Sequence, residues 1–203
     1  MRSWRLVLPV KDLGAAKSRL VPPVGVQRAD LALAFAFDAT AAALAVGVPV
    51  LVTTSSSSVV AAFRAEWAGD AVEVLEDAPP GLNEAVSFAL GRCGDGPVGV
   101  MTADLPALRG SSLQRALLAA EQVPYAVVPD AAGTGTTLLA ALDPARVRPS
   151  FGPGSCAAHL ADGAHVLEAG VDLRLDVDTA EDLEAARALG LGPATRALLA
   201  SAA

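Results

Sequence analysis

Short apolar runs recur along the 203 residues of this chain, and helix-like segments separate most of them. The runs are Arg5–Val10, Val48–Thr53, Val72–Leu75, Val98–Thr102, Tyr125–Pro129 and Thr136–Leu142. Such alternation is typical of an α/β domain with a mostly parallel sheet flanked by helices. The length suits one domain better than two. We therefore predict a single α/β domain over residues 1–203.

Polar residues mark where several of the intervening helices begin. The segment Gln27–Thr40 is alanine-rich and lacks Gly and Pro, which predicts a long helix. We interpret Ser55–Ser58 as a helix start with a capping serine, and Ser111 and Ser112 as the start of another helix. Thr179 stands three residues before Asp182, an approximate capping box that predicts a further helix.

Composition excludes several classes of protein. The formal net charge is -7 and the sequence pI is about 4.7, which argues against a broad nucleic-acid surface. No charge-free apolar stretch of about 18 residues is present, so we expect neither a membrane span nor a signal peptide, and a cytoplasmic protein. Cys93 and Cys156 form no CxxC pair and are predicted to be free thiols. His159 and His165 are expected to be structural rather than metal ligands.

A basic loop follows the first predicted strand, at Leu8–Leu20. Open α/β sheets bind ligands at the carboxyl ends of their strands, so the loop suits phosphates. It lacks both the GxxxxGK[ST] and the GxGxxG patterns of phosphate-binding loops, so phosphate binding would depend more on its basic side chains. In an extended loop Lys17 and Arg19 would face one triphosphate, with Arg19 making a forked contact. The alternative is a solvated turn with ordinary surface lysines. We assign to nucleotide binding Pro9, Val10, Lys11 and Lys17.

One carboxylate follows the buried run at residues 98–102. Asp104 stands just after this strand and before Pro106, which places it at the carboxyl edge of the sheet beside the basic loop. Such a carboxylate suits Mg²⁺, which takes oxygen ligands and keeps waters and substrate phosphates as its other ligands. The alternative is that Asp104 caps the next turn.

Two further carboxylates lie in Asp172–Thr179, where apolar and polar residues alternate. A strand here would place Asp176 and Asp178 on one face, where their charges repel unless a cation lies between them. A divalent metal shared with Asp104 would supply that cation. The alternative is that these aspartates cap the helix that begins at Thr179.

Glycines and hydroxyls are combined in residues 130–139 and again in residues 150–159. Gly152 and Gly154 permit close backbone approach, and Ser155 opens a predicted helix whose first N–H groups would receive a small anion. Between the two halves of the chain, Gly81 opens another predicted helix. There Asn83 either reads a base or ribose edge or caps the helix.

Several segments, taken in chain order, resemble the guanylyltransferases of coenzyme F420 biosynthesis. The segments are LPVKDLGAAKSRL, GLNEA, TADLPAL, GTGTTLL, FGPGSCAAHL and LDVDT. The resemblance covers about residues 5–185 and implies a single-domain, GT-A-like, Rossmann-related nucleotidyltransferase with a mixed, mostly parallel sheet. Such enzymes join GMP from GTP to a three-carbon phosphorylated acid, which is phosphoenolpyruvate in actinobacterial members and 2-phospho-L-lactate in archaeal ones.

The resemblance also implies roles for particular residues. It places the acid-phosphate site at Thr137, Gly152 and Ser155, and Mg²⁺ ligation at Asp104 and at Asp176 or Asp178. Catalytic roles fall to Lys17, Arg19 and Asp104, with the two basic residues stabilising the departing pyrophosphate. Glu84 stands where a small residue is expected.

The resemblance implies transfer of GMP from GTP to a three-carbon phosphorylated acid. We predict phosphoenolpyruvate as that acid, because the alanine-rich, lysine-poor composition is typical of a high-GC bacterial gene. The nearest alternative is the same reaction on 2-phospho-L-lactate. A molybdenum cofactor guanylyltransferase is disfavoured, since KSRL replaces the GGxSxRxG loop expected there. A non-catalytic nucleotide-binding regulator is the remaining alternative. The product would be handed to the next transferase of the F420 pathway.

Overall fold

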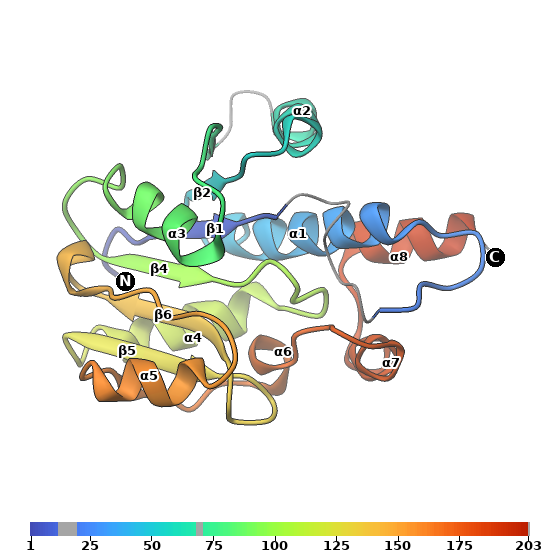
Figure 1. Cartoon of the computed structure of the whole chain (residues 1–203). Helices are drawn as coiled ribbons and strands as arrows, with labels where there is room; N and C mark the ends of the chain where they lie inside the picture. Colours follow the sequence, from blue (N-terminus) through green and yellow to red (C-terminus); the bar gives the residue numbers. More distant parts are fainter. Residues whose placement is uncertain (12–19, 68–70, 203) are drawn as a thin grey trace.

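The computed structural model describes residues 1–11, 20–67 and 71–202. A seven-stranded sheet with the order β3-β2-β1-β4-β6-β5-β7 forms the centre of this part of the chain (Figure 1). The strands are β1 (Arg5–Pro9), β2 (Val50–Thr53), β3 (Val72–Leu75), β4 (Val98–Met101), β5 (Tyr125–Pro129), β6 (Thr136–Ala141) and β7 (His165–Val166). The helices are α1 (Arg28–Leu44), α2 (Ser57–Glu66), α3 (Leu82–Leu90), α4 (Gly110–Ala120), η2 (Pro144–Arg146), α5 (Ser155–Ala161), α6 (Val171–Arg174), α7 (Ala180–Leu189) and α8 (Pro193–Ser201).

Strand β6 is the one antiparallel element of the described sheet. It pairs antiparallel with both β4 and β5, whereas β1, β2, β3 and β4 pair in parallel and β7 runs parallel to β5. Because β6 runs against its neighbours, it begins at the edge where β1, β4 and β5 end. The predicted mixed, mostly parallel α/β sheet is confirmed, and residues at the start of β6 join its carboxyl edge.

Helices cover both faces of the sheet, with α3 and α5 on one face and α1, α4 and α6 on the other (Figure 1). Alternating side chains of β1 feed the two resulting cores. Leu6 and Leu8 join the core beneath α1 and α4, and Val7 joins the core beneath α3. All three side chains are fully buried. Strand β1 is thus covered on both faces, which explains why its sequence is continuously apolar there.

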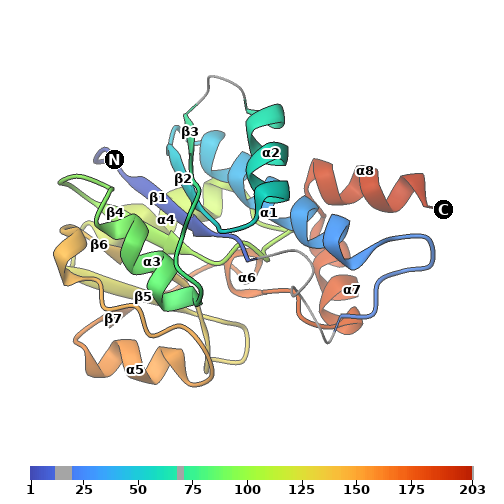
Figure 2. The ribbon, with the colours of Figure 1, turned by 45° about the horizontal axis from the view of Figure 1, so that its top comes forward.

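A third apolar cluster lies beyond the sheet, where α7 and α8 gather beside one end of α1 (Figure 2). Buried Asp38 of α1 accepts hydrogen bonds from the backbone N–H groups of Ala194 and Thr195, at 2.8 and 3.0 Å, and so caps the start of α8. Burial raises the pKa of the Asp38 carboxyl, and these donors act in the opposite direction. A Cβ on Gly192 would lie 2.3 Å from Asp38 Cγ, so glycine is needed at this crossing.

The predicted helix starts agree with the structure, although their caps differ. Thr179 and Asp182 form the predicted capping box, with Asp182 N–H donating to Thr179 Oγ1 at 3.2 Å and Thr179 N–H to Asp182 Oδ2 at 2.8 Å. Helix α2 follows Ser56 at its N-cap, but the Ser56 side chain makes no capping hydrogen bond. At the start of α4 the cap comes from Asp172, which accepts from Arg109 N–H at 3.0 Å.

The strand predicted over residues 172–179 is wrong. The segment begins in the short helix α6, because buried Asp172 turns back to accept from Arg109 N–H and the Ser112 hydroxyl at the start of α4. After α6, Val177 N–H donates a backbone hydrogen bond to the Asp104 carbonyl at 3.0 Å, which joins this segment to the end of β4. This segment therefore runs alongside the end of β4 without forming a strand.

Two smaller features complete the fold. Cys93 and Cys156 are free thiols, as predicted, and burial raises the pKa of Cys93 to about 11. None of the helices in the described ranges is both long enough and apolar enough to cross a membrane.

Replacing Asp38 by Ala removes both acceptors at the start of α8, and we expect a loss of about 1–3 kcal/mol of unfolding free energy. Urea denaturation measures this. The matched control is Asp95→Ala at an exposed loop position, expected to stay within about 0.5 kcal/mol of the parent. Equal effects of the two changes would contradict the capping role.

Candidate active site at the carboxyl edge of the sheet

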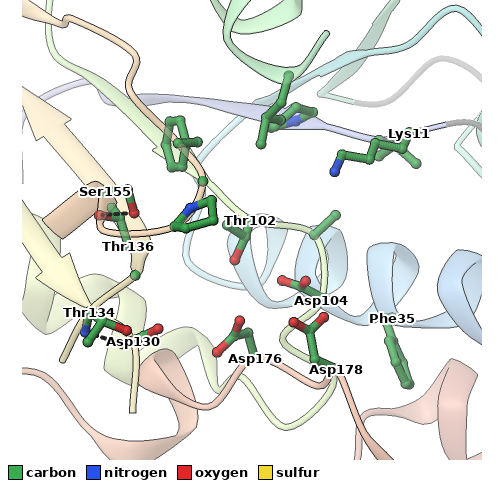
Figure 3. Close-up of a pocket in the computed structure, with 18 of the residues that line it drawn as sticks. Lys11, Phe35, Thr102, Asp104, Asp130, Thr134, Thr136, Ser155, Asp176 and Asp178 are labelled. Carbon is green, nitrogen blue, oxygen red and sulfur yellow. Dashed lines mark hydrogen bonds between the residues drawn. The ribbon is translucent and has the colours of Figure 1, made fainter. Parts of the chain in front are cut away.

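A cavity of about 640 Å³ opens at the carboxyl edge of the sheet. Its walls come from the ends of β1 and β4, the start of β6, the glycine loop at residues 151–155, and the segment after α6. Figure 3 shows acidic side chains on one side of this space and a pair of hydroxyls on another. Residues far apart in the sequence therefore meet in one place.

The acidic side consists of Asp104, Asp176 and Asp178, which all line the cavity (Figure 3). Val177 between the latter two is fully buried in the third apolar cluster, so the extended backbone turns both flanking carboxylates toward the cavity. The three carboxylates therefore line one cavity, although the segment that carries Asp176 and Asp178 is not the predicted strand. The capping box of α7 is formed by Thr179 and Asp182.

These carboxylates are suited to a hard divalent cation by their chemistry. Within the described ranges, no group of three His, Cys, Asp or Glu side chains is arranged closely enough to hold a metal ion by itself. Mg²⁺ commonly binds through one or two carboxylates together with substrate phosphates. The cavity fits that kind of shared ligation rather than a closed protein cage.

The opposite side of the cavity carries the hydroxyls of Thr136 and Ser155, both buried. Ser155 Oγ donates to Thr136 Oγ1 at 3.1 Å. Behind the pair, the fully buried ring of His159 has its Nδ1 at 3.0 Å from Thr136 Oγ1, and its Nε2 accepts from Ser150 N–H at 3.1 Å. Burial lowers the pKa of His159, which favours the neutral ring.

The threonine at the cavity is one residue away from the one predicted. Thr136 lines the cavity, whereas the Thr137 hydroxyl is directed to the Val128 carbonyl at 3.5 Å, within the sheet. Side chains alternate along a strand, so only one of two adjacent threonines can face the cavity. The backbone carbonyl of Thr137 accepts from Thr102 N–H at 3.0 Å, which ties β6 to the end of β4.

The start of α5 differs from the prediction that its N–H groups receive an anion. The N–H groups of Ser155 and Cys156 already donate to the carbonyls of Gly152 and Thr134, both at 3.1 Å. The polar groups that face the cavity here are side-chain hydroxyls instead. Gly152 and Gly154 have φ values of +136° and +75°, which an L side chain adopts only with strain, so this loop requires glycine.

Asn83 neither caps α3 nor faces the cavity. Its amide makes two hydrogen bonds to one residue of the glycine loop: Phe151 N–H donates to Asn83 Oδ1 at 2.7 Å, and Asn83 Nδ2 donates to the Phe151 carbonyl at 3.1 Å. These bonds turn the amide toward the loop backbone, and Asn83 is not among the residues that line the cavity. The structure therefore assigns Asn83 to holding the glycine loop against α3.

Sequence reasoning missed the turn that leads into β6. Asp130 Oδ1 accepts from Thr134 N–H at 2.9 Å, and a Cβ on Gly135 would lie 2.4 Å from Asp130 Oδ2. The Arg174 guanidinium donates to the carbonyls of Pro129 and Asp130 at 3.2 and 2.8 Å, which holds the backbone at the start of the turn. The sequence feature that could have predicted this turn is Asp130 followed by glycines and threonines, since Asp side chains commonly accept hydrogen bonds from nearby backbone N–H groups in turns.

The basic side of the site is described in part. Pro9, Val10 and Lys11, which were assigned to nucleotide binding from the sequence, line the cavity, and Lys11 extends toward it (Figure 3). Lys17 and Arg19 lie outside the described residues.

Solved structures place this architecture among the nucleotidyltransferases. A nucleotidyl transferase from Methanothermobacter thermautotrophicus has a TM-score of 0.65 and 16% identity, covering 92% of this chain and 97% of that one. A candidate nucleotide-diphospho-sugar transferase from Desulfovibrio desulfuricans has a TM-score of 0.73 and 20% identity, with coverage of 99% and 95%. The manganese complex of Rv0371c from Mycobacterium tuberculosis has a TM-score of 0.55 and 20% identity, with coverage of 92% and 98%. The fold is that of GT-A-like nucleotidyltransferases.

Sequence relatives define the family more narrowly. The family described as "Guanylyl transferase CofC like" matches residues 4–201, and this chain belongs to it. A phosphoenolpyruvate guanylyltransferase of Thermomonospora curvata is 47% identical, covering 98% of this chain and 89% of its own length. Another, of Streptomyces avermitilis, is 46% identical, covering 97% of this chain and 94% of its own.

Replacing Asn83 by Ala should loosen the glycine loop, because both bonds to Phe151 are lost. We expect amide hydrogen exchange at Phe151 to accelerate by roughly tenfold or more, the factor that one hydrogen bond represents. Exchange monitored by NMR measures this. Ser87→Ala removes a bond from Ser87 Oγ to the Asn83 carbonyl on the same helix and serves as the control. Unchanged Phe151 exchange in Asn83→Ala would overturn the assignment.

Proposed function

We propose that this protein transfers GMP from GTP to phosphoenolpyruvate, giving enolpyruvyl-diphospho-guanosine and diphosphate in coenzyme F420 biosynthesis. The observation that carries the proposal is a single cavity in which carboxylates from two segments face a buried hydroxyl pair. The names of the relatives and the family match support the same activity. Neither favours a molybdenum cofactor enzyme or a regulatory module.

The acid substrate is assigned to the hydroxyl side of the cavity. Thr136 and Ser155 supply hydroxyls there, and Gly152 lets the backbone approach the ligand without a side chain between them. Thr137 contributes as the strand neighbour that fixes β6 against β4. Ser155 Oγ donates to Thr136 Oγ1, which leaves the Thr136 hydrogen as a donor for a phosphate or carboxylate oxygen, the polar groups of phosphoenolpyruvate.

Asp104, with Asp176 and Asp178, would hold Mg²⁺ together with phosphates of the substrates. A bound divalent cation supplies charge neutralisation and in-line alignment of reacting oxygens. This requirement follows from charge, because a cavity lined by several carboxylates repels a triphosphate unless cations are present.

The nucleotide is assigned to the loop after β1. Pro9 and Val10 present the end of β1 to the cavity, and Lys11 offers an ammonium to the phosphates. Lys17 and Arg19 are proposed to stabilise negative charge on the departing pyrophosphate.

In the proposed reaction a phosphate oxygen of the acid forms a bond to the α-phosphorus of GTP, and the bond from that phosphorus to the β-phosphate oxygen breaks. Pyrophosphate carries the leaving electron pair. The attacking phosphate is already deprotonated near neutral pH, so no side chain is needed as a base. The protein contributes position and charge.

The test is pyrophosphate release from GTP and Mg²⁺, with phosphoenolpyruvate or 2-phospho-L-lactate supplied separately. The next transferase of the pathway is present as a trap for an unstable product. Turnover with phosphoenolpyruvate supports the proposal. Turnover with 2-phospho-L-lactate alone would keep the reaction type but make phospholactate, and not phosphoenolpyruvate, the acid substrate. No release with either acid would overturn the assigned activity.

Replacing Asp104 by Asn keeps the shape of the side chain and removes its charge. We expect pyrophosphate release to fall by at least about a hundredfold, because charge stabilisation at the reacting phosphates is lost. The same assay measures this, with thermal unfolding as a check of the fold. Asp95→Asn, exposed and outside the cavity, should retain full rate. Retained rate in Asp104→Asn would contradict its assignment.

A further inference from the structure

Two hydrogen bonds fix which nitrogen of His159 carries the hydrogen. Ser150 N–H donates to Nε2 at 3.1 Å, so Nε2 holds a lone pair. A neutral imidazole has one N–H, which must then be on Nδ1. The ring is fully buried, and burial favours its uncharged form.

The groups around the ring support the same state. Thr136 on β6 presents a hydroxyl, Ser150 a backbone N–H, and Phe151 an aromatic ring at 5.3 Å between centroids. The charged group that acts on the ring is Asp162, the residue that follows α5. Its charge raises the pKa of His159, but by less than burial lowers it. Both ring nitrogens are thus engaged by a hydroxyl and a backbone N–H, and neither of these partners is a carboxylate that would stabilise a cation.

The Nδ1 hydrogen has consequences for Thr136. Nδ1–H donates to Thr136 Oγ1 at 3.0 Å, and Ser155 Oγ donates to the same oxygen at 3.1 Å. A hydroxyl oxygen accepts two hydrogen bonds, so both acceptor positions of Thr136 are filled. The hydrogen of the Thr136 hydroxyl can then be donated to a third partner. Because Thr136 lines the cavity, that partner can be a ligand bound there.

We propose that His159 is a positioning residue that makes the Thr136 hydroxyl an obligate hydrogen-bond donor toward the cavity, selecting an oxyanion of the phosphorylated acid at that point. The proposal rests on the proposed function. A ligand group that can only donate hydrogen bonds would find no acceptor there, whereas a phosphate or carboxylate oxygen would. The ring acts through Thr136 and does not touch the substrate.

The same ring also joins the hydroxyl pair to the glycine loop. Ser150 precedes Phe151, which Asn83 holds against α3, so the Ser150 N–H to Nε2 bond fixes the adjoining end of the loop. Protonation at Nε2 would remove this acceptor. His159 therefore links two walls of the acid site.

Steady-state kinetics on purified full-length variants tests the proposal. Thr136→Val removes the hydroxyl, His159→Gln removes the Nδ1 donor, and His159→Asn keeps an amide donor near the Nδ1 position. We expect His159→Gln and Thr136→Val each to raise KM for the acid by about tenfold, with KM for GTP and kcat within about twofold. The double variant should raise KM for the acid no more than the larger of the two single changes does, because both substitutions act on the same hydroxyl. His159→Asn should recover most of the loss.

Exposed His165 supplies the matched control, and His165→Gln should leave every kinetic constant unchanged. Additive effects in the double variant, or equal increases in KM for GTP and acid, would overturn the positioning role and indicate a general packing effect.

A measurement on the unmutated protein keeps the test valid if the variants fail to fold. Imidazole ¹⁵N chemical shifts at neutral pH should show His159 protonated at Nδ1 and unprotonated at Nε2. The opposite tautomer, or a cationic ring, would overturn the proposal. An unmutated enzyme that is inactive with both acids would overturn the proposed function instead, and the tautomer would still be measurable.

Discussion

The reversed direction of β6 is the constraint on which this site depends. Because β6 runs antiparallel between β4 and β5, its first residue lies at the edge where its neighbours end. A parallel strand of six residues in the same place would carry Thr136 to the other edge, about 20 Å away. The reversal therefore brings a hydroxyl from β6 opposite Asp104, which follows β4, and creates a cavity with an acidic side and a donor side.

A few backbone contacts hold these two sides in position. The backbone bond from Val177 N–H to the Asp104 carbonyl aligns the segment after α6 with the end of β4. Asp172 fixes the other end of that segment at the start of α4. On the opposite side, Asn83 and His159 hold the glycine loop by its backbone. The side chains that face the cavity are thus positioned by polar groups that do not line it.

Much of the fold could be predicted from local pattern. The apolar runs became strands β1 to β6, and the capping box at Thr179 was found as expected. The strand predicted over residues 172–179 failed because the alternation there was outweighed by the capping bonds of Asp172 to α4. The alternation still predicted which residues face the cavity, since an extended segment alternates its side chains with or without a strand partner.

The sequence by itself determined the order of strands and helices along the chain, that Asp104 follows a buried strand, and that Asp176 and Asp178 alternate with apolar neighbours, because each of these follows from a pattern spanning a few residues. The tertiary structure alone decided that Thr136 rather than Thr137 lines the cavity, that Asn83 holds a loop, and that His159 orients a hydroxyl. The partners in these contacts lie 68 residues apart for Asn83 and Phe151, and 23 apart for Thr136 and His159. Local patterns carry no information on such pairs, because their hydrogen bonds form only when packed elements bring distant segments together.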